Sequence, residues 1–197
     1  MKILFTTLFD PDDLGSRCLA AYLKQFGHEV RIVALKAYTW NTYSFFPTQE
    51  DVEKCTMLWD SGFSKTGYLK SDDIFADEYM LYAEELKVWQ PDIIGIGTRT
   101  KNLKYFPSFI PLMRETCPNA FIVAGGMGPM LDPEGVLECG VDAVIRGEGE
   151  YALLDLVTAL EKGENWHNIQ NISYKNKEKV IKNALRPQEK DLNAFPV

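Results

Sequence analysis

Short runs of β-branched and aliphatic residues alternate along the chain with longer segments whose apolar residues recur at helical spacing. The short runs cover residues 2–7, 30–35, 92–97, 120–124 and 142–145. Helical spacing marks residues 14–26, 78–89, 103–115, 133–139 and 151–161. Strands and helices that alternate in this way build a parallel sheet with helices on both faces. The pattern predicts a doubly wound α/β fold, Rossmann-like or flavodoxin-like, with a five-stranded parallel sheet.

The pattern changes near the C-terminal end of the chain. Two short apolar runs, residues 172–174 and 179–181, flank the polar turn Lys175-Asn176-Lys177-Glu178 and predict a small β-hairpin. The final residues, 186–197, have the composition of an extended linker. We therefore divide the chain into an α/β domain over residues 1–165 and a hairpin with a linker over residues 166–197.

One connection is much longer than the others. Residues 36–77 lie between the second predicted strand and the next helix, whereas loops at such positions usually have about 2–6 residues. The insertion is rich in aromatic residues, among them Trp40, Trp59 and Tyr68. Aromatic side chains serve equally in packing and in recognition. An extra layer on the sheet edge and a flap over a ligand or partner both remain open.

Composition narrows the class of protein. Hydrophobic residues make up 46% of the chain and charged residues 25%, as in soluble globular proteins. The formal net charge of −7 argues against a basic surface for nucleic acid or anionic lipid. No apolar run approaches the roughly 20 residues of a membrane span, and the N-terminal run is too short for a signal peptide. We expect a cytoplasmic protein with no nucleic-acid or membrane partner.

The cysteines predict no metal site of their own. Cys18, Cys55, Cys117 and Cys139 stand far apart, without the short spacings that chelate zinc or an iron–sulfur cluster from one loop. Free cysteines of this kind are most often small buried hydrophobes in a reducing compartment.

In an open parallel sheet the ligand crevice lies beyond the carboxyl ends of the strands, so the loops at residues 8–15, 98–102, 125–130 and 146–150 are the candidates. The third of these loops begins with Gly125-Gly126. A glycine pair at a strand end lets backbone approach a ligand, but it also makes an ordinary tight turn. The run Arg146-Gly147-Glu148-Gly149-Glu150 is likewise compatible with a cleft wall or with a glycine turn that opens a helix.

The first loop is acidic. Asp10, Asp12 and Asp13 suit a helix N-cap and the positive end of a helix dipole. The same carboxylates would repel a phosphate, which disfavours a flavin or nucleotide in this loop. A dinucleotide fingerprint is absent from the first strand end, and Gly97-Thr98 stands where a phospho-receiver needs aspartate.

Several of these segments together resemble a known family. They are the loop Asp10-x-x-x-x-Gly15, the strand Asp-Ile-Ile-Gly-Ile-Gly at residues 92–97, the pair Gly125-Gly126 and the run Val-Ile-Arg-Gly-Glu-Gly-Glu at residues 144–150. The combination resembles the N-terminal cobalamin-binding domain of cobalamin-dependent radical S-adenosylmethionine (SAM) enzymes. Residues 186–196 resemble that family's linker into its radical SAM domain. The resemblance covers nearly the whole chain except residues 36–77.

The resemblance implies how cobalamin would be held. Related proteins with a D-x-H-x-x-G loop ligate cobalt through the histidine, and Asp12 occupies that position here. Carboxylate is a poor substitute for imidazole on a cobalt of low oxidation state. The resemblance therefore implies base-off cobalamin without a histidine ligand, and we expect His28 and His167 to be surface residues.

The family's strand-end serine is replaced by Gly97, with Thr98 and Thr100 nearby. The implied cofactor-binding residues are Asp10, Asp12, Leu14, Gly15, Thr98, Arg99, Thr100, Gly125, Gly126, Gly147, Glu148 and Gly149.

The resemblance also implies a larger parent protein. The parent would be an enzyme, a methyltransferase or a related radical enzyme with a small-molecule substrate, whose [4Fe-4S] cluster and SAM are bound outside these residues. The chain itself shows no nucleophile–base pair or metal triad, so we expect a cofactor-binding module without catalytic residues. Two alternatives stay open: a Rossmann-like interaction domain that has lost cobalamin, and a flavin- or nucleotide-binding domain.

Overall fold

The computed structural model describes residues 1–8, 13–35, 39–41, 55–60, 65–69, 76–191 and 194–195. Asp10 and Asp12 lie outside these residues. The elements, in chain order, are β1 (Lys2–Leu8), α1 (Leu14–Gln25), β2 (Glu29–Leu35), β3 (Thr39–Asn41), β4 (Cys55–Asp60), β5 (Lys65–Leu69), α3 (Ala76–Trp89), β6 (Ile93–Gly97), the 3-10 helix η1 (Thr100–Tyr105), α4 (Phe106–Thr116), β7 (Phe121–Gly125), α5 (Met127–Leu131), α6 (Pro133–Glu138), β8 (Ala143–Ile145), α7 (Glu150–Lys162), β9 (Ile172–Asn176) and β10 (Lys179–Lys182).

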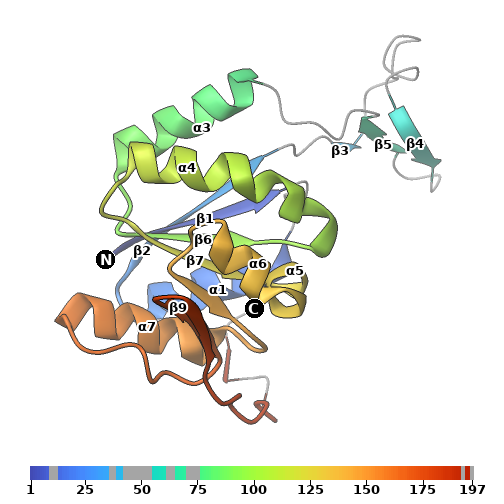
Figure 1. Ribbon diagram of the computed structural model, residues 1–197. Coiled ribbons are helices and arrows are strands. Elements are labelled where there is room, and N and C mark those ends of the chain that lie inside the picture. The colour runs from blue at the N-terminus through green and yellow to red at the C-terminus, as the bar shows by residue number, and fades with distance from the viewer. Residues whose placement is uncertain are drawn as a thin grey trace.

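A single twisted sheet organises the molecule (Figure 1). Its strand order is β10-β9-β8-β7-β6-β1-β2, and the five strands from β8 to β2 are parallel. The sequence prediction of five parallel strands is confirmed, but the sheet has seven strands. The C-terminal hairpin pairs with β8 in antiparallel register, Ile145 opposite Ile172, and so continues the sheet instead of standing apart from it.

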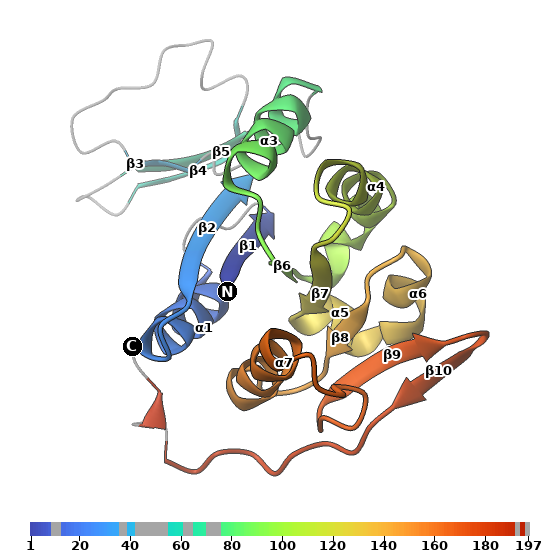
Figure 2. The same cartoon turned by 90° about the vertical axis from the view of Figure 1, so that its left-hand side faces the viewer.

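The helices cover both faces of the sheet (Figure 2). On one face, α1 and α7 bury a core that includes Ile3, Phe5, Val123 and Leu156. On the other face, α3, α4 and α6 bury a second core. Successive strand residues point to opposite faces, which explains why neighbours such as Ile3 and Leu4 belong to different cores. The predicted doubly wound arrangement is confirmed.

The chain reverses its direction of travel across the sheet beside β1. After β1 it moves outward to β2 with α1 on one face, and after β2 it returns to β6 on the other side of β1 with α3 on the opposite face. Ligand crevices of open parallel sheets form at such a switch point, beyond the carboxyl ends of the strands. The crevice is therefore expected at the ends of β1 and β6.

Two local features differ from the sequence expectation. The segment expected as one helix over residues 103–115 begins as η1 and becomes α-helical only at Phe106. Pro107 lies in the first turn of α4, where proline is tolerated because its missing N–H would have no partner inside the helix. The short helix α5 after Gly126 was not expected, since five residues carry no periodic pattern.

Little of the insertion is described. Within residues 36–77, β3, β4 and β5 form a separate antiparallel sheet in the order β3-β5-β4. The two interpretations of the insertion, an extra layer and a flap, depend on side chains that lie outside the described residues. In the part of the chain that the structure describes, no helix is long and apolar enough to cross a membrane.

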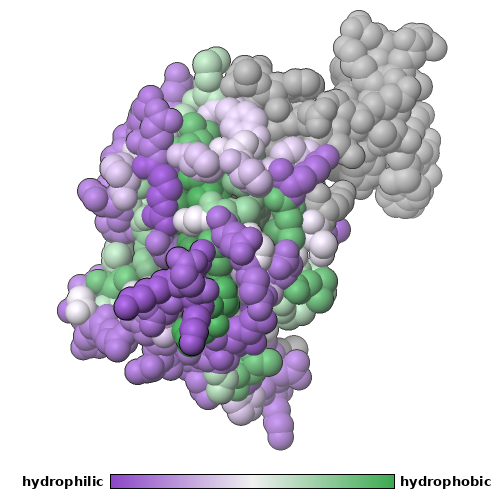
Figure 3. Space-filling model, viewed as in Figure 1, coloured by the Kyte–Doolittle hydropathy of each residue, from purple (hydrophilic) through white to green (hydrophobic). Residues whose placement is uncertain are grey.

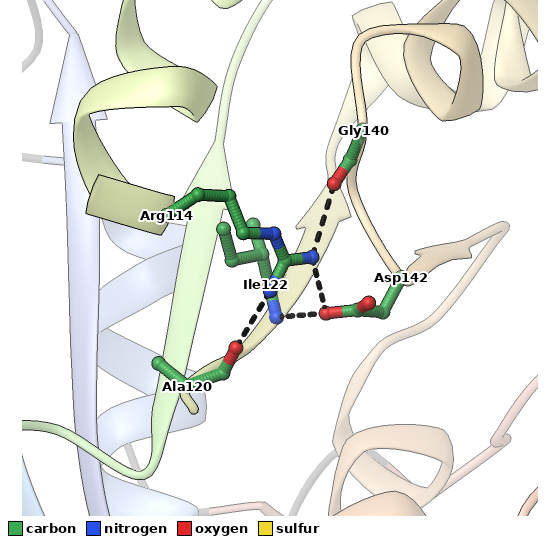
Figure 4. Close-up of polar contacts among 5 residues, drawn as sticks. All are labelled: Arg114, Ala120, Ile122, Gly140 and Asp142. Atoms are coloured by element: carbon green, nitrogen blue, oxygen red, sulfur yellow. Dashed lines mark hydrogen bonds and ion pairs between the residues drawn. The ribbon is translucent and has the colours of Figure 1, made fainter. Parts of the chain in front are cut away.

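A guanidinium–carboxylate network at the amino end of the sheet fixes the β7–β8 side of the fold (Figure 4). Arg114 donates through Nη1 to the carbonyl of Ala120 at 2.8 Å and through Nη2 to the carbonyl of Gly140 at 3.0 Å. The same Nη2 lies 2.6 Å from Asp142 Oδ2. That oxygen also accepts the backbone N–H of Ile122 at 2.7 Å. One side chain from α4 thus joins the chain around β7 to the start of β8.

We predict that Arg114→Lys destabilises the protein by about 1–3 kcal/mol, because a single ammonium cannot reproduce the planar fork. The measurement is chemical denaturation followed by circular dichroism. Arg31→Lys is the matched control. Arg31 makes an exposed ion pair with Glu85 and lies over the Trp89 ring, and a lysine ammonium can make both contacts, so the change should stay below about 0.5 kcal/mol. Equal losses in the two variants would contradict the assigned role of the network.

Candidate functional site

A cavity of about 470 Å³ opens at the switch point beside β1. It lies against the carboxyl ends of β1, β6, β7 and β8 and is closed on one side by α1 and α7. The lining residues come from all of these elements and the loops that follow them: Phe5, Thr7, Leu8, Asp13, Gly15, Ser16, Leu19, Gly95, Ile96, Gly97, Thr98, Arg99, Asn102, Val123, Ala124, Gly125, Gly126, Met127, Ile145, Gly147, Glu148, Gly149, Glu150 and Leu153.

The deep part of the cavity is apolar and lies between the sheet and the helices α1 and α7. Phe5, Val123 and Ile145 contribute from the strands, and Leu19 and Leu153 from the helices. Register places Phe5 beside Gly95 and Gly95 beside Val123, so this row of the sheet presents one bare backbone position. A Cβ on Gly95 would lie 2.6 Å from the ring of Phe5, which means that the ring occupies the space that a side chain at residue 95 would fill.

The next row of paired residues, nearer the carboxyl ends of the strands, has fewer side chains. Thr7 pairs with Gly97, and Gly97 pairs with Gly125. These residues follow Phe5, Gly95 and Val123 by two positions and therefore face the same side of the sheet. Two neighbouring strands thus end in glycine on the face that α1 and α7 cover. The space beside Gly125 is open and belongs to the cavity, whereas Ser16 and Asp13 lie against Gly97.

The two glycines after β7 have different roles. Gly126 has a φ of 94°, and a Cβ there would lie 2.7 Å from the carbonyl oxygen of Thr98, so the turn itself requires glycine. Gly125 has no atom within 4 Å of its would-be Cβ and lines the cavity. Of the two interpretations that the sequence left open, the tight turn applies to Gly126 and close approach to a cavity applies to Gly125.

The loop after β8 forms one wall and is fixed from outside by Asn171. Gly147 has a φ of 83°, which turns the chain away from the strand. Asn171 Nδ2 donates to the carbonyl of Glu148 at 2.9 Å, and Asn171 Oδ1 accepts the backbone N–H of Arg186 at 2.7 Å. The carboxylate of Glu148 in turn accepts the backbone N–H of Glu189 at 2.8 Å. The segment after β10 therefore braces the cavity wall.

Polar groups gather at the other side of the cavity, where α1 begins. Asp13 caps α1 by accepting the N–H of Ser16 at 3.0 Å. Asn102, from η1, donates through Nδ2 to the carbonyl of Leu8 at 3.1 Å and fixes the end of β1. The ring of lining residues is acidic on balance, with Asp13, Glu148 and Glu150 against Arg99. This side of the cavity suits neutral or donor-bearing groups better than phosphates.

The structure brings eight of the twelve residues proposed from the sequence to the cavity, namely Gly15, Thr98, Arg99, Gly125, Gly126, Gly147, Glu148 and Gly149. Leu14 and Thr100 do not line it, and Leu14 is 66% exposed. Asp10 and Asp12 lie outside the described residues. Whether the eight residues bind a cofactor stays a prediction.

Sequence reasoning missed the apolar depth of the cavity and the polar pair at the start of α1. Phe5, Gly95 and Val123 were assigned only to strands, and their common face could have been found by counting alternate positions back from Thr7, Gly97 and Gly125. Ser16 and Leu19 carried no signal beyond the helical pattern of α1.

The two histidines lie away from the cavity. His167 is exposed and stacks on Trp166 with ring centroids 4.2 Å apart. His28 stands at the amino end of β2 and is only 8% exposed, so its expected place at the surface was wrong. Burial lowers the pKa of its imidazole. Within the described residues, no group of three or more His, Cys, Asp and Glu side chains is placed to hold a metal ion.

Comparison with known proteins matches the part of the chain that forms much of the cavity. The sequence model of the B12 binding domain family matches residues 74–157, which include β6, β7, β8 and both glycine loops. This part of the chain is similar to B12 binding domains. An uncharacterized methyltransferase of Pyrococcus horikoshii is 34% identical over 131 residues, which are 66% of this chain and 28% of that protein. An anaerobic magnesium-protoporphyrin IX monomethyl ester cyclase of Cereibacter sphaeroides is 26% identical over 146 residues, covering 72% of this chain and 24% of that protein.

Solved structures share the fold of this chain. The radical SAM methyltransferase TsrM of Kitasatospora setae superposes with a TM-score of 0.65 at 16% identity, over 93% of this chain and 30% of TsrM. The cobalamin-dependent radical SAM enzyme OxsB gives a TM-score of 0.65 at 19% identity, over 95% of this chain and 22% of OxsB. The resemblance stated from the sequence is confirmed. The chain spans less than a third of the length of these relatives.

The distinct roles of the two glycines predict opposite effects of alanine on folding. Gly126→Ala should cost about 1–3 kcal/mol of stability, because the new Cβ adds backbone strain and a clash with Thr98. Gly125→Ala should leave stability unchanged or raise it by up to about 1 kcal/mol, because its backbone is compatible with alanine and the space is open. Thermal unfolding of the two variants measures the difference, and a Gly125→Ala loss as large as that of Gly126→Ala would contradict it.

Proposed function

We propose that this chain is the cobalamin-binding module of a radical SAM enzyme, a methyltransferase or a related radical enzyme. The observation that carries the proposal is the cavity beside β1, whose glycine-lined wall follows β7 within the residues that match the B12 binding domain family. Among solved proteins of the same fold, OxsB binds aqua-cobalamin and SAM, and TsrM binds cobalamin and a [4Fe-4S] cluster. The chain covers under a third of those proteins, so the cluster, SAM and the small-molecule substrate belong to the rest of the parent.

The residues present fit the two ends of cobalamin. Cobalamin has a corrin ring with amide side chains and a nucleotide tail that ends in an aromatic base. The apolar depth between the sheet and the helices α1 and α7 offers a dry slot for the base, since Val123, Ile145 and Leu153 bury hydrophobic surface there. The bare backbone at Gly125 leaves room where a side chain would obstruct the ligand. The ring would then lie at the mouth.

We propose that the bound cobalamin is base-off and has no protein nitrogen ligand. His28 and His167 are the two histidines of the chain, and neither lines the cavity. A tail inserted beside the sheet also draws the base away from cobalt. Bound in this way, cobalamin supplies a cobalt centre that can carry an alkyl group. The residues of this chain bind and orient the cofactor and exclude water from its tail.

Hydrophobic surface beside the mouth supports docking of a further domain of the parent. Met127, Met130 and Leu131 of α5 are exposed, and Figure 3 shows this apolar area at the edge of the molecule. Met127 also lines the cavity. Exposed apolar patches at a cofactor mouth are typical of interaction sites. We propose that the radical SAM domain of the same parent chain packs against this patch and over the exposed side of the corrin ring.

The proposal is tested by incubating the protein with hydroxocobalamin, removing free ligand by desalting and recording the absorption spectrum. The expected result is about one cobalamin per chain with a base-off spectrum. A folded protein that retains no cobalamin would overturn the proposal and favour an interaction domain. A yellow protein that retains flavin instead would favour the nucleotide-binding alternative, which the acidic side of the cavity opposes.

Gly125 gives a graded test of the site. Gly125→Leu should lower hydroxocobalamin affinity at least about tenfold, because its side chain enters open cavity space that the ligand needs. Gly125→Ala should have a much smaller effect, and both variants should unfold near the temperature of the unaltered protein. Unchanged affinity of a folded Gly125→Leu protein would remove this wall from the site.

A further inference from the structure

The start of α1 presents a pair of hydrogen-bond acceptors to the cavity. Ser16 donates to Asp13 Oδ2 through both its backbone N–H, at 3.0 Å, and its hydroxyl. Both residues line the cavity, and Ser16 is only 3% exposed. Because the hydroxyl proton is directed at Asp13, the remaining capacity of Ser16 Oγ is to accept. Among the residues that the structure describes, the hydrogen bonds to the Asp13 carboxylate end on Oδ2, so Oδ1 retains its lone pairs.

Gly97 makes room for this pair. A Cβ on Gly97 would lie 3.0 Å from Ser16 Oγ and 3.3 Å from Asp13 Oδ2, closer than ordinary side-chain contacts. The pair therefore occupies the space that a side chain at the end of β6 would fill. In this chain the polar function at the junction of β1, β6 and α1 comes from the helix, and the strand contributes bare backbone.

We propose that Asp13 and Ser16 together bind a hydrogen-bond donor of cobalamin, either an amide N–H of the corrin side chains or a hydroxyl of the nucleotide sugar. This inference rests on the proposed function and adds two specificity-determining residues to it. A carboxylate accepts hydrogen bonds and cannot donate them, and bonds to a charged acceptor are stronger than neutral ones. The same carboxylate repels phosphate oxygens, so the pair would face a donor of cobalamin and not the phosphodiester of its nucleotide tail.

Asp13→Asn is the decisive variant. Asparagine is as good an N-cap as aspartate, so its carbonyl oxygen can keep the bonds from Ser16 and preserve α1. The amide NH₂ then takes the place of Oδ1 and turns a donor toward the donor of the ligand. We expect hydroxocobalamin to bind at least about tenfold more weakly by equilibrium titration, with little change in the unfolding temperature. Ser16→Ala, which removes one acceptor, should weaken binding by about three- to tenfold.

Asp132→Asn is the matched control. Asp132 caps α6 by accepting the N–H of Gly135 at 3.0 Å and does not line the cavity. This variant makes the same chemical change at a second helix N-cap, so its affinity for hydroxocobalamin should equal that of the unaltered protein. A loss as large as that of Asp13→Asn would show that the effect comes from capping and would overturn the inference.

Cobinamide, which lacks the nucleotide, identifies the donor. If Asp13→Asn weakens cobalamin but not cobinamide, the pair binds a hydroxyl of the nucleotide sugar. If it weakens both equally, the pair binds a corrin amide. Asp13→Asn affinity within about twofold of an unaltered protein that binds cobalamin would overturn the inference and leave the proposed function standing. An unaltered protein that binds no cobalamin would instead contradict the proposed function, and the inference with it.

Discussion

The reversal of strand order beside β1 is the constraint on which the rest of the structure depends. Because α1 leaves the end of β1 on one face of the sheet and α3 lies on the other, no helix of the described residues fills the space above β1 and β6. The cavity occupies that space. Its position follows from topology, and only its depth and chemistry depend on individual side chains.

Glycines in the sheet make the cavity deep, because they place no side chain between the strands and the covering helices. Gly95, Gly97 and Gly125 lie on the same face of neighbouring strands, where other residues would project toward α1 and α7. Each vacant position is used differently: the ring of Phe5 lies on Gly95, the acceptor pair of α1 lies against Gly97, and Gly125 remains open. A sheet that packed tightly against both helices would be more stable but would leave no slot for a ligand. Core packing is therefore incomplete at the carboxyl ends of the strands, while the two hydrophobic cores on the faces of the sheet are retained.

Much of the fold could be predicted from the sequence because local pattern and global fold agree. The parallel strands, their helices and the hairpin follow from the alternation of apolar runs, and the candidate loops follow from the position of strand ends. The pairing of the hairpin with β8 could not be predicted, because hydrogen bonds between strands distant in sequence leave no periodic mark. The 3-10 helix η1 runs directly into α4, so the spacing of apolar residues did not separate the two, and α5 is too short to show a period.

The candidate site, like the fold, could be predicted only in part from the sequence. Glycines and polar residues at strand ends marked the mouth, whereas Phe5, Ser16, Leu19 and Leu153 were hidden within strand and helix patterns. These residues meet only because α1 and α7 cover the same face.

The most direct test of the account is a crystal structure of the protein with hydroxocobalamin. The account predicts electron density for the nucleotide tail between Val123, Leu19 and Leu153, with the corrin ring above Gly125. Cobalamin bound elsewhere on the chain, with this slot closed, would contradict it.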